Sequence, residues 1–402
     1  MLNFMNKIRK DFPFFNQKDC ITFFDSAASS QKPKCVIDKI IEFYSYNFAN
    51  IHRGIYDLSA KATEDFEKVR LSVAKFINAS SDKEIVFTKS ATEGINLVAH
   101  SFGKKFINEG DEILISTMEH HSNIVPWQQL CEERNATLKI IPISKDGKLK
   151  FDEFEKLLSS KVKLVAITHM SNVFGSVIDI KKVVKLAKKY VAKVLVDACQ
   201  SIARMKIDVI DLDCDFLVFS SHKLYGPTGV GVLYGKYDLL DYMDVYQTGG
   251  SMIEYVSFEK TTFLKPPHKF EAGTPAIAEV KAFGETINYL SSINLEKHWK
   301  EEKELAKYIR SEIKKLKNFE IFGNDEETSI ISITHKKAHH SDIGEILNKS
   351  KIAIRTGHHC AKPLMDFLRV SGVARISLGI YNNLEDADAL IEALKKVNKF
   401  FA

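Results

Sequence analysis

The sequence contains the segment Asp215-Phe-Leu-Val-Phe-Ser-Ser-His-Lys-Leu-Tyr-Gly-Pro-Thr-Gly-Val-Gly-Val-Leu-Tyr234, which places a lysine in a polar loop between two apolar runs. The runs at 215–219 and 230–234 are rich in β-branched and aromatic residues, which predicts two short buried strands. The Gly-Pro-Thr-Gly stretch between them predicts a turn. Lys223 is therefore either a solvated surface lysine or a functional amine. A lysine near apolar walls and other cations loses its proton readily and forms Schiff bases with carbonyl groups.

Upstream of this segment, apolar strand patterns alternate with amphipathic helix patterns. The predicted strands are 21–24, 84–88, 112–116, 137–141, 163–168 and 193–196, and the helical spacings lie at 34–48, 59–78, 93–107, 122–134, 152–159 and 180–190. Near-continuous apolar strands separated by amphipathic helices predict an α/β fold with a mostly parallel sheet that is covered on both faces.

This alternation ends after residue 234. Residues 241–275 are loop-rich, and a long helical pattern covers 276–317. Strand-like runs follow at 330–334, 352–355 and 374–378, and an amphipathic helix at 384–400 closes the chain. We therefore predict a large α/β domain over 21–275 and a smaller α+β domain formed by 1–20 and 276–402.

Composition excludes several classes of function. The 402 residues are 45% hydrophobic and 27% charged, with a net charge of +5 spread along the chain. The chain has no basic block with interleaved aromatics and no apolar run of membrane-spanning length, so we expect no nucleic acid and no membrane partner. The N-terminal stretch lacks the apolar core of a secretory signal. Six scattered cysteines suit reduced thiols, so we expect a cytoplasmic location.

Polar residues follow the predicted strands, at the sheet edge where doubly wound folds bind ligands. Ser90 and Glu93 have capping-box spacing, and the helix start they predict offers backbone N–H groups for a phosphate, with Thr92 adding a hydroxyl. A plain helix cap is the alternative. The pair His120-His121 could stack on a ring and move protons, ligate a metal, or lie on the surface.

Two later strand ends complete this set. Asn172 lies beyond the strand at 163–168, and Asp197 directly follows the run at 193–196. A buried aspartate requires a cationic partner, and a protonated pyridine nitrogen is one; a helix N-cap is the alternative role. A phosphate seat, a histidine, an asparagine, an aspartate and Lys223 together fit pyridoxal phosphate better than any metal.

The second domain contains the cysteine loop Arg355-Thr-Gly-His-His-Cys-Ala-Lys-Pro363, which we expect to be exposed. Neighbouring positive charge favours the thiolate form of Cys360. Zinc is the competing interpretation, because His335, His339, His340 and His358 to Cys360 form a dense set. Their spacing does not match a structural zinc site, so we expect no metal. Arg375 could clamp a carboxylate or form a surface ion pair.

These motifs carry a resemblance to a known family. They are Asp25-Ser-Ala-Ala-Ser, His52-Arg-Gly, Ala91-Thr-Glu-Gly-Ile-Asn96, Met118-Glu-His-His, Ser220-Ser-His-Lys-Leu-Tyr-Gly-Pro-Thr-Gly-Val-Gly, Phe270-Glu-Ala-Gly-Thr-Pro275, Arg355-Thr-Gly-His-His-Cys-Ala and Ala374-Arg. The chain resembles the cysteine desulfurases of the aminotransferase class V superfamily, pyridoxal-phosphate fold type I. It is most similar to their SUF-type branch, which includes selenocysteine lyases.

The resemblance implies a role for each motif residue. Lys223 binds the cofactor covalently and later moves a proton, and Cys360 is the nucleophile. Asp197 pairs with the pyridine nitrogen, Gln200 contacts the ring hydroxyl and His120 stacks on the ring. The phosphate is held by Thr92, the backbone at Ala91, Ser220, His222 and Thr274, the last from the partner subunit of a homodimer. Asn172 and Arg375 orient the substrate carboxylate.

The implied reaction converts L-cysteine to L-alanine and leaves the sulfur on Cys360 as a persulfide. A small acceptor protein then takes this sulfur, for iron–sulfur cluster assembly. Selenocysteine lyase or cysteine sulfinate desulfinase is the alternative activity, and a non-catalytic sulfur carrier or zinc scaffold is the alternative class. The chain departs from the family pattern at Tyr56 and at Cys199, which is either inert packing or a redox-sensitive neighbour of the ring.

Overall fold

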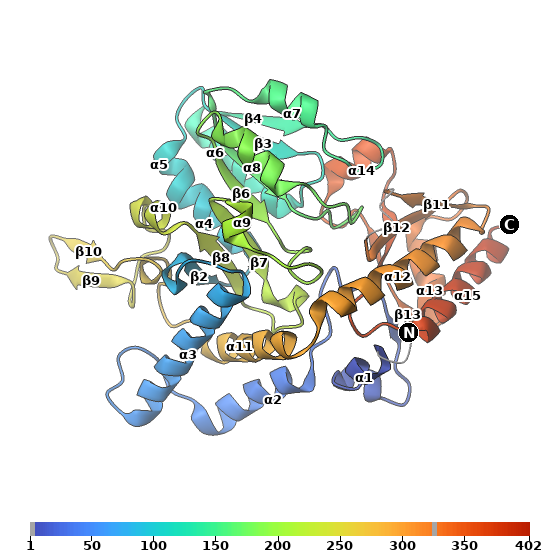
Figure 1. Ribbon diagram of the computed structural model, residues 1–402, viewed down its shortest axis with the longest axis horizontal. Coiled ribbons are helices and arrows are strands. Elements are labelled where there is room, and N and C mark those ends of the chain that lie inside the picture. The colour runs from blue at the N-terminus through green and yellow to red at the C-terminus, as the bar shows by residue number, and fades with distance from the viewer. Residues whose placement is uncertain (1–4, 324–327) are drawn as a thin grey trace.

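A seven-stranded sheet forms the centre of the protein in the computed structural model, which describes residues 5–323 and 328–402 (Figure 1). Its strands, in spatial order, are β2 (Ile85–Thr88), β8 (Gly231–Gly235), β7 (Phe216–Ser220), β6 (Lys193–Asp197), β5 (Val162–Thr168), β3 (Glu112–Ser116) and β4 (Thr137–Ile141). Strand β8 pairs antiparallel with β2 and β7, and the other pairs are parallel. The predicted mostly parallel sheet is confirmed.

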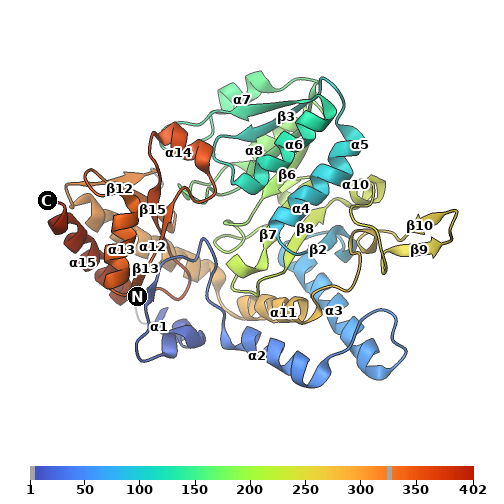
Figure 2. The same cartoon turned by 180° about the vertical axis from the view of Figure 1, so that it is seen from behind.

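Helices cover both faces of this sheet (Figures 1 and 2). Alternate residues of β7 show the division: Leu217 and Phe219 belong to one apolar core, and Phe216 and Val218 to the other. The first core is closed by α3 (Asp57–Phe76), α8 (Ile180–Lys188) and α11 (Ile277–Ser292), and the second by α4 (Ala91–Leu97) and α6 (Val125–Arg134). Burial on both faces explains why β7 reads as an unbroken apolar run.

A smaller antiparallel sheet packs beside the first. It contains β11 (Phe319–Phe322), β12 (Ile330–His335), β15 (Val373–Ser377) and β14 (Arg355–Gly357) in that order, covered by α12 (Leu295–Lys314), α13 (His340–Lys349) and α15 (Leu384–Phe400). Strand β1 (Thr22–Phe23) pairs with β13 (Ile352–Ala353), so the segment before the large sheet packs with the C-terminal part of the chain. The domain boundary near residue 275 stays a prediction.

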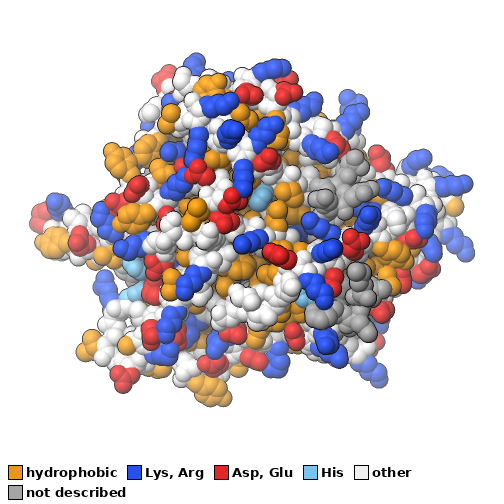
Figure 3. Space-filling model, viewed as in Figure 1, with side chains coloured by type: hydrophobic (Ala, Val, Ile, Leu, Met, Phe, Trp, Pro, Cys, Tyr) orange, Lys and Arg blue, Asp and Glu red, His pale blue; other side chains and the backbone are white. Residues whose placement is uncertain are grey.

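The remaining helices are short connections. They are α1 (Met5–Arg9), α2 (Lys34–Glu42), α5 (Lys104–Phe106), α7 (Phe151–Leu157), α9 (Val209–Leu212), α10 (Tyr237–Tyr242) and α14 (Lys362–Leu368). None of the helices in the described ranges is long and apolar enough to span a membrane. Basic and acidic side chains are interspersed over the face drawn in Figure 3.

One sequence prediction is wrong at the level of elements, and one segment contains a hairpin that was not predicted. The helix expected over 276–317 is two helices, because the chain turns at Ile293 and the Asn294 side chain caps α12 by accepting from the Lys297 N–H at 3.1 Å. The segment expected to be loop-rich over 241–275 also contains the antiparallel hairpin β9 (Ile253–Val256) and β10 (Thr261–Phe263), which projects from the body of the molecule (Figure 1).

Candidate active site

A cavity of about 220 Å³ lies where the carboxyl ends of the parallel strands face the smaller sheet. The residues predicted from strand ends and motifs line it, namely Ala91, Thr92, His120, Asn172, Asp197, Gln200, Ser220, His222, Lys223 and Arg375. Segments that are far apart in the sequence therefore converge on one space. Two predicted residues, Cys360 and Thr274, are not part of this lining.

Lys223 ends a short 3-10 turn, Ser221–Lys223, which directly follows β7. The segment before α2 fixes this turn: the Ser30 N–H donates to the His222 carbonyl at 3.0 Å, and the Ser30 hydroxyl accepts from the Tyr225 N–H at 2.8 Å. Burial, together with the charges of Lys223 and Lys32, lowers the pKa of His222 to about 4. The His222 ring is thus neutral at neutral pH.

Asp197 closes β6 and is 6% exposed. Its Oδ1 accepts from the Cys199 N–H at 2.9 Å. Across the cavity, burial and the Lys223 charge lower the pKa of His120 to about 4, against the opposing effect of Asp197. The pKa of the Cys199 thiol is raised well above its usual range, first by burial and then by Asp197. A protonated, buried thiol favours the interpretation of Cys199 as packing.

Hydroxyl groups gather at the start of α4. Ser90 caps this helix by accepting from the Glu93 N–H at 3.2 Å, while the Ala91 N–H donates to Ser220 Oγ at 2.8 Å. Strand β8 approaches closely, because a Cβ added at Gly231 would lie 2.3 Å from the Ser90 carbonyl carbon. The helix start and the Thr92 and Ser220 hydroxyls together form a seat suited to a phosphate.

Arg375 reaches the cavity from β15 and is 1% exposed. Its guanidinium donates to the Asn172 carbonyl at 3.1 Å and to Asp25 Oδ1 at 3.2 Å, and its Nε–H has no hydrogen-bond partner among the described residues. Burial lowers the pKa of Arg375 to about 10, so it is a cation at neutral pH. A buried cation with a spare donor suits a carboxylate ligand.

The cysteine loop is held against the large sheet: His358, Lys362 and Pro363 are exposed as expected, whereas Cys360 is half-buried. The His121 N–H donates to the Cys360 carbonyl at 2.7 Å, and Asn172 Nδ2 donates to the His359 carbonyl at 2.8 Å. His359 and Cys360 both have left-handed backbone, with φ of 52° and 56°. Such residues persist where their surroundings hold them, and they cluster at functional sites.

The thiol lies at the margin of the cavity. Arg355 Nη2 is 3.8 Å from Cys360 Sγ, and Arg355 and His359 both line the cavity. Thr274 lies elsewhere, lining a separate cavity of about 360 Å³ with Lys89, Gly229 and Tyr246. Within one chain, Thr274 does not reach the predicted phosphate seat.

Sequence reasoning missed Glu119, which is fully buried beside His120. Its carboxylate accepts from the Ser116 hydroxyl at 2.5 Å, the Thr168 N–H at 3.0 Å and Asn123 Nδ2 at 2.7 Å. Burial raises the pKa of Glu119 to about 7, against these hydrogen bonds. A charged residue shortly after an apolar strand was the available signal, as it was for Asp197.

Among the described residues, one group of three has ligand atoms close enough for a metal: His52, Glu67 and His268. Both oxygens of the Glu67 carboxylate already accept hydrogen bonds from Arg70, at 2.7 Å from Nε and 3.2 Å from Nη2. Cys360 and the histidines beside it are not in this group.

The model of the aminotransferase class-V family matches residues 22–390. The chain belongs to this family. It is 45% identical to a cysteine desulfurase of Wigglesworthia glossinidia brevipalpis over 98% of both chains, and 43% identical to a probable cysteine desulfurase of Halalkalibacterium halodurans over 98% of both. It is also similar to the solved cysteine desulfurase CsdA of Escherichia coli, at 34% identity and a TM-score of 0.94 over 99% of both chains.

Class-V enzymes of this kind depend on pyridoxal phosphate, and the cavity has the groups that this cofactor needs. A buried carboxylate, Asp197, suits a pyridinium nitrogen, and Lys223 offers an amine for the aldehyde. The hydroxyls and helix start at Ser90 to Thr92 suit the phosphate. The residues present therefore fit the group.

Proposed function

We infer that this chain is a cysteine desulfurase, which converts L-cysteine to L-alanine and retains the sulfur on Cys360 as a persulfide. The observation that carries the inference is the attachment of the cysteine loop to His121 and Asn172, which holds Cys360 at the margin of the cavity that Lys223 lines. The similarity to cysteine desulfurases over nearly the whole chain supports it.

When bound, pyridoxal phosphate supplies an aldehyde for amines and a ring that accepts electrons from the substrate Cα. Lys223 would hold that aldehyde through its amine and would carry the Cα proton. Asp197 keeps the ring nitrogen protonated. Because burial and the Lys223 charge hold the pKa of His120 at about 4, its ring is neutral at neutral pH and would lie against the cofactor as a hydrogen-bond and proton acceptor.

Arg375 binds the substrate carboxylate, and Asn172 adds an amide beside it. The Cys360 thiolate attacks the substrate sulfur, so an S–S bond forms as the substrate Cβ–S bond breaks. The electron pair of that bond stays with the carbon fragment, which gains protons and leaves as alanine. Arg355 Nη2 lies 3.8 Å from the Cys360 sulfur and offers it a hydrogen-bond donor.

The experiment is incubation of the purified holoenzyme with L-cysteine while alanine and sulfane sulfur are measured. We expect equal amounts of the two products, and no cysteine turnover in Cys360→Ala. Selenocysteine turnover that survives in the same variant would fit the proposed chemistry, since that reaction needs no persulfide. Cysteine turnover that survives in Cys360→Ala would instead favour the lyase or desulfinase alternative.

The proposal includes a homodimer, a small sulfur-acceptor protein and a role in iron–sulfur cluster assembly in the cytoplasm. Large apolar side chains exposed around α2 and α3 support a subunit interface: Tyr46 is 80% exposed, Phe48 60% and Ile55 104%. Thr274, remote from the phosphate seat of its own chain, suits a contribution to the partner's site. A candidate acceptor protein that leaves the rate of alanine formation unchanged would contradict the proposed transfer of sulfur to an acceptor.

A further inference from the structure

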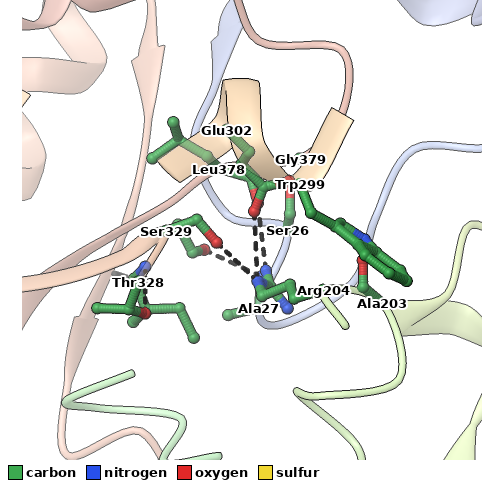
Figure 4. A network of polar contacts seen from close by, with 12 residues as sticks. Ser26, Ala27, Ala203, Arg204, Trp299, Glu302, Thr328, Ser329, Leu378 and Gly379 are labelled. Carbon is green, nitrogen blue, oxygen red and sulfur yellow. Dashed lines mark hydrogen bonds and ion pairs between the residues drawn. The ribbon is translucent and has the colours of Figure 1, made fainter. Parts of the chain in front are cut away.

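One buried arginine joins the two sheets beside the cavity (Figure 4). Arg204 lies beyond β6 and is 7% exposed. Its Nη1 donates to the Gln200 carbonyl and to Gln200 Oε1, both at 3.1 Å. Its Nε donates to Ser329 Oγ at 3.0 Å, and its Nη2 to the Leu378 carbonyl at 3.2 Å.

These partners come from different parts of the fold. Gln200 follows β6 of the large sheet, Ser329 precedes β12, and Leu378 follows β15, the strand that carries Arg375. Glu302 of α12, 1% exposed, adds an ion pair at 3.5 Å between its Oε1 and the Arg204 Nε. One guanidinium thus fixes Gln200 relative to the smaller sheet.

The contact with Arg204 also decides which way the Gln200 amide points. Arginine has donors and no acceptor, so the oxygen of the amide must face it. The other end, Nε2, donates to the Ala27 carbonyl at 2.8 Å, and Ala27 and Gln200 both line the cavity. The Arg204 donors and the Ala27 carbonyl therefore favour the same orientation of the amide, with its oxygen towards Arg204 and its NH₂ group towards Ala27.

We propose that Arg204 is a positioning residue that holds the Gln200 amide with its N–H donors on the cofactor side. The inference rests on the proposed function in that the ligand is pyridoxal phosphate, whose ring oxygen is a hydrogen-bond acceptor. Gln200 supplies an N–H donor to that oxygen, and Arg204 keeps the Gln200 amide oxygen turned away from it. The same guanidinium aligns this contact with the strand that carries Arg375.

A double-mutant cycle tests the proposal through the Kd of pyridoxal phosphate, measured by equilibrium dialysis. The variants are Gln200→Ala, Arg204→Lys and both together. Lysine keeps a cation opposite Glu302 but cannot reproduce the planar fork of donors. Each single variant is expected to weaken binding about tenfold, as for a lost hydrogen bond to a charged group. The double variant is expected to bind no more weakly than Gln200→Ala.

Gln200→Glu tests the need for a donor without altering Arg204. Its carboxylate still accepts from Arg204 but offers no N–H to the ring oxygen or to the Ala27 carbonyl, so we expect at least the binding loss of Gln200→Ala and an altered absorption spectrum of the bound cofactor. Equal weakening by Arg204→Lys in both Gln200 backgrounds, or wild-type binding by Arg204→Lys or Gln200→Glu, would overturn the proposal.

Glu302→Gln is the matched control, because it removes the ion pair and leaves the Arg204–Gln200 contacts. It is expected to lower the melting temperature and leave the Kd of the cofactor unchanged; a loss of affinity equal to that of Arg204→Lys would mean that the network acts through stability alone. Alanine formation by the wild-type enzyme tests the proposed function separately, because the cycle measures binding.

Discussion

The buried carboxylate of Glu119, next to His120, is held by a chain of directed hydrogen bonds. Glu119 accepts three hydrogen bonds with no exposure to water, and its Asn123 partner in turn accepts from Trp127 Nε1 at 2.8 Å. Since Trp127 requires an acceptor, the Asn123 amide cannot turn round. The direction of each hydrogen bond is therefore fixed: Trp127 donates to Asn123, and Asn123 donates to Glu119, the residue next to His120.

Glu119→Gln is expected to destabilise the protein by about 1–3 kcal/mol, because an amide NH₂ would face the NH₂ of Asn123. Adding Asn123→Asp should restore much of the loss, since a carboxylate in place of the Asn123 amide accepts both from the newly introduced NH₂ group and from Trp127. Chemical denaturation of the holoenzyme measures both effects. A double variant no more stable than Glu119→Gln would contradict the assigned direction of these hydrogen bonds.

The pH dependence of stability has a component from buried histidines. Burial lowers the pKa of His169 from 6.5 to about 4, and the pKa values of His120, His222 and His359 shift the same way. A base with a lowered native pKa stabilises the fold fully above pH 6.5, and this stability is lost as the pH falls toward 4. Burial raises the pKa values of Glu119 and Glu302 from 4.5 to about 7. These two carboxyl groups therefore stabilise the fold at low pH, and that stability is lost as the pH rises from 4.5 to 7.

We therefore expect His169→Gln to lose less stability than the wild type between pH 6.5 and pH 4. The difference between the two proteins isolates the histidine, because the glutamate contributions are common to both. Urea denaturation at fixed protein and cofactor concentrations measures it. Parallel curves for the two proteins would show that His169 does not titrate in this window.

At the scale of elements, much of the site was predictable because its residues follow strands in the sequence. Asp197 and Lys223 stand out for this reason: each is a charge placed shortly after a buried apolar run. The hydrogen bond from Asn172 to the cysteine loop leaves no such signal, because it joins residues 187 positions apart. The break at Ile293 was hidden for another reason, since that residue continues the apolar spacing of the helices on either side.

We expect the loop between β3 and α6 to hold the cysteine loop in position. His121 Nε2 accepts from the Lys362 N–H at 3.0 Å, next to the contact between the His121 N–H and the Cys360 carbonyl. His121→Ala removes the first contact, while His121→Gln can retain an acceptor. We expect alanine formation to fall about fivefold in His121→Ala, the value of one hydrogen bond, and less in His121→Gln. Equal rates in the two variants would contradict this role.

At the scale of the whole molecule, the proposed dimer makes a prediction from the position of Thr274. Lys223→Ala lacks the amine in every site, and Thr274→Ala lacks one phosphate contact in every site. If Thr274 acts across the subunit interface, a mixed dimer contains one site with both residues intact. Co-refolding the two variants should therefore restore activity above that of either alone, measured at limiting cofactor. Activity no higher than the average of the separate variants would place Thr274 outside the partner's site.

The architecture was accessible from the sequence, because alternating patterns define the layers before any contact is known. The meeting of the cysteine loop with the large sheet was not, since it depends on how the smaller sheet packs. That packing is set by buried groups such as Arg204, whose partners at Gln200, Glu302, Ser329 and Leu378 carry no shared motif.

The central claim is that Lys223 and Cys360 serve one cofactor cavity. Mass spectrometry of the holoenzyme after brief exposure to L-cysteine, without reductant, tests it most directly. We expect one added sulfur atom on the peptide that contains Cys360, in step with alanine release, and no added sulfur in Lys223→Ala. Sulfur on another cysteine, or on Cys360 in the Lys223→Ala protein, would contradict it.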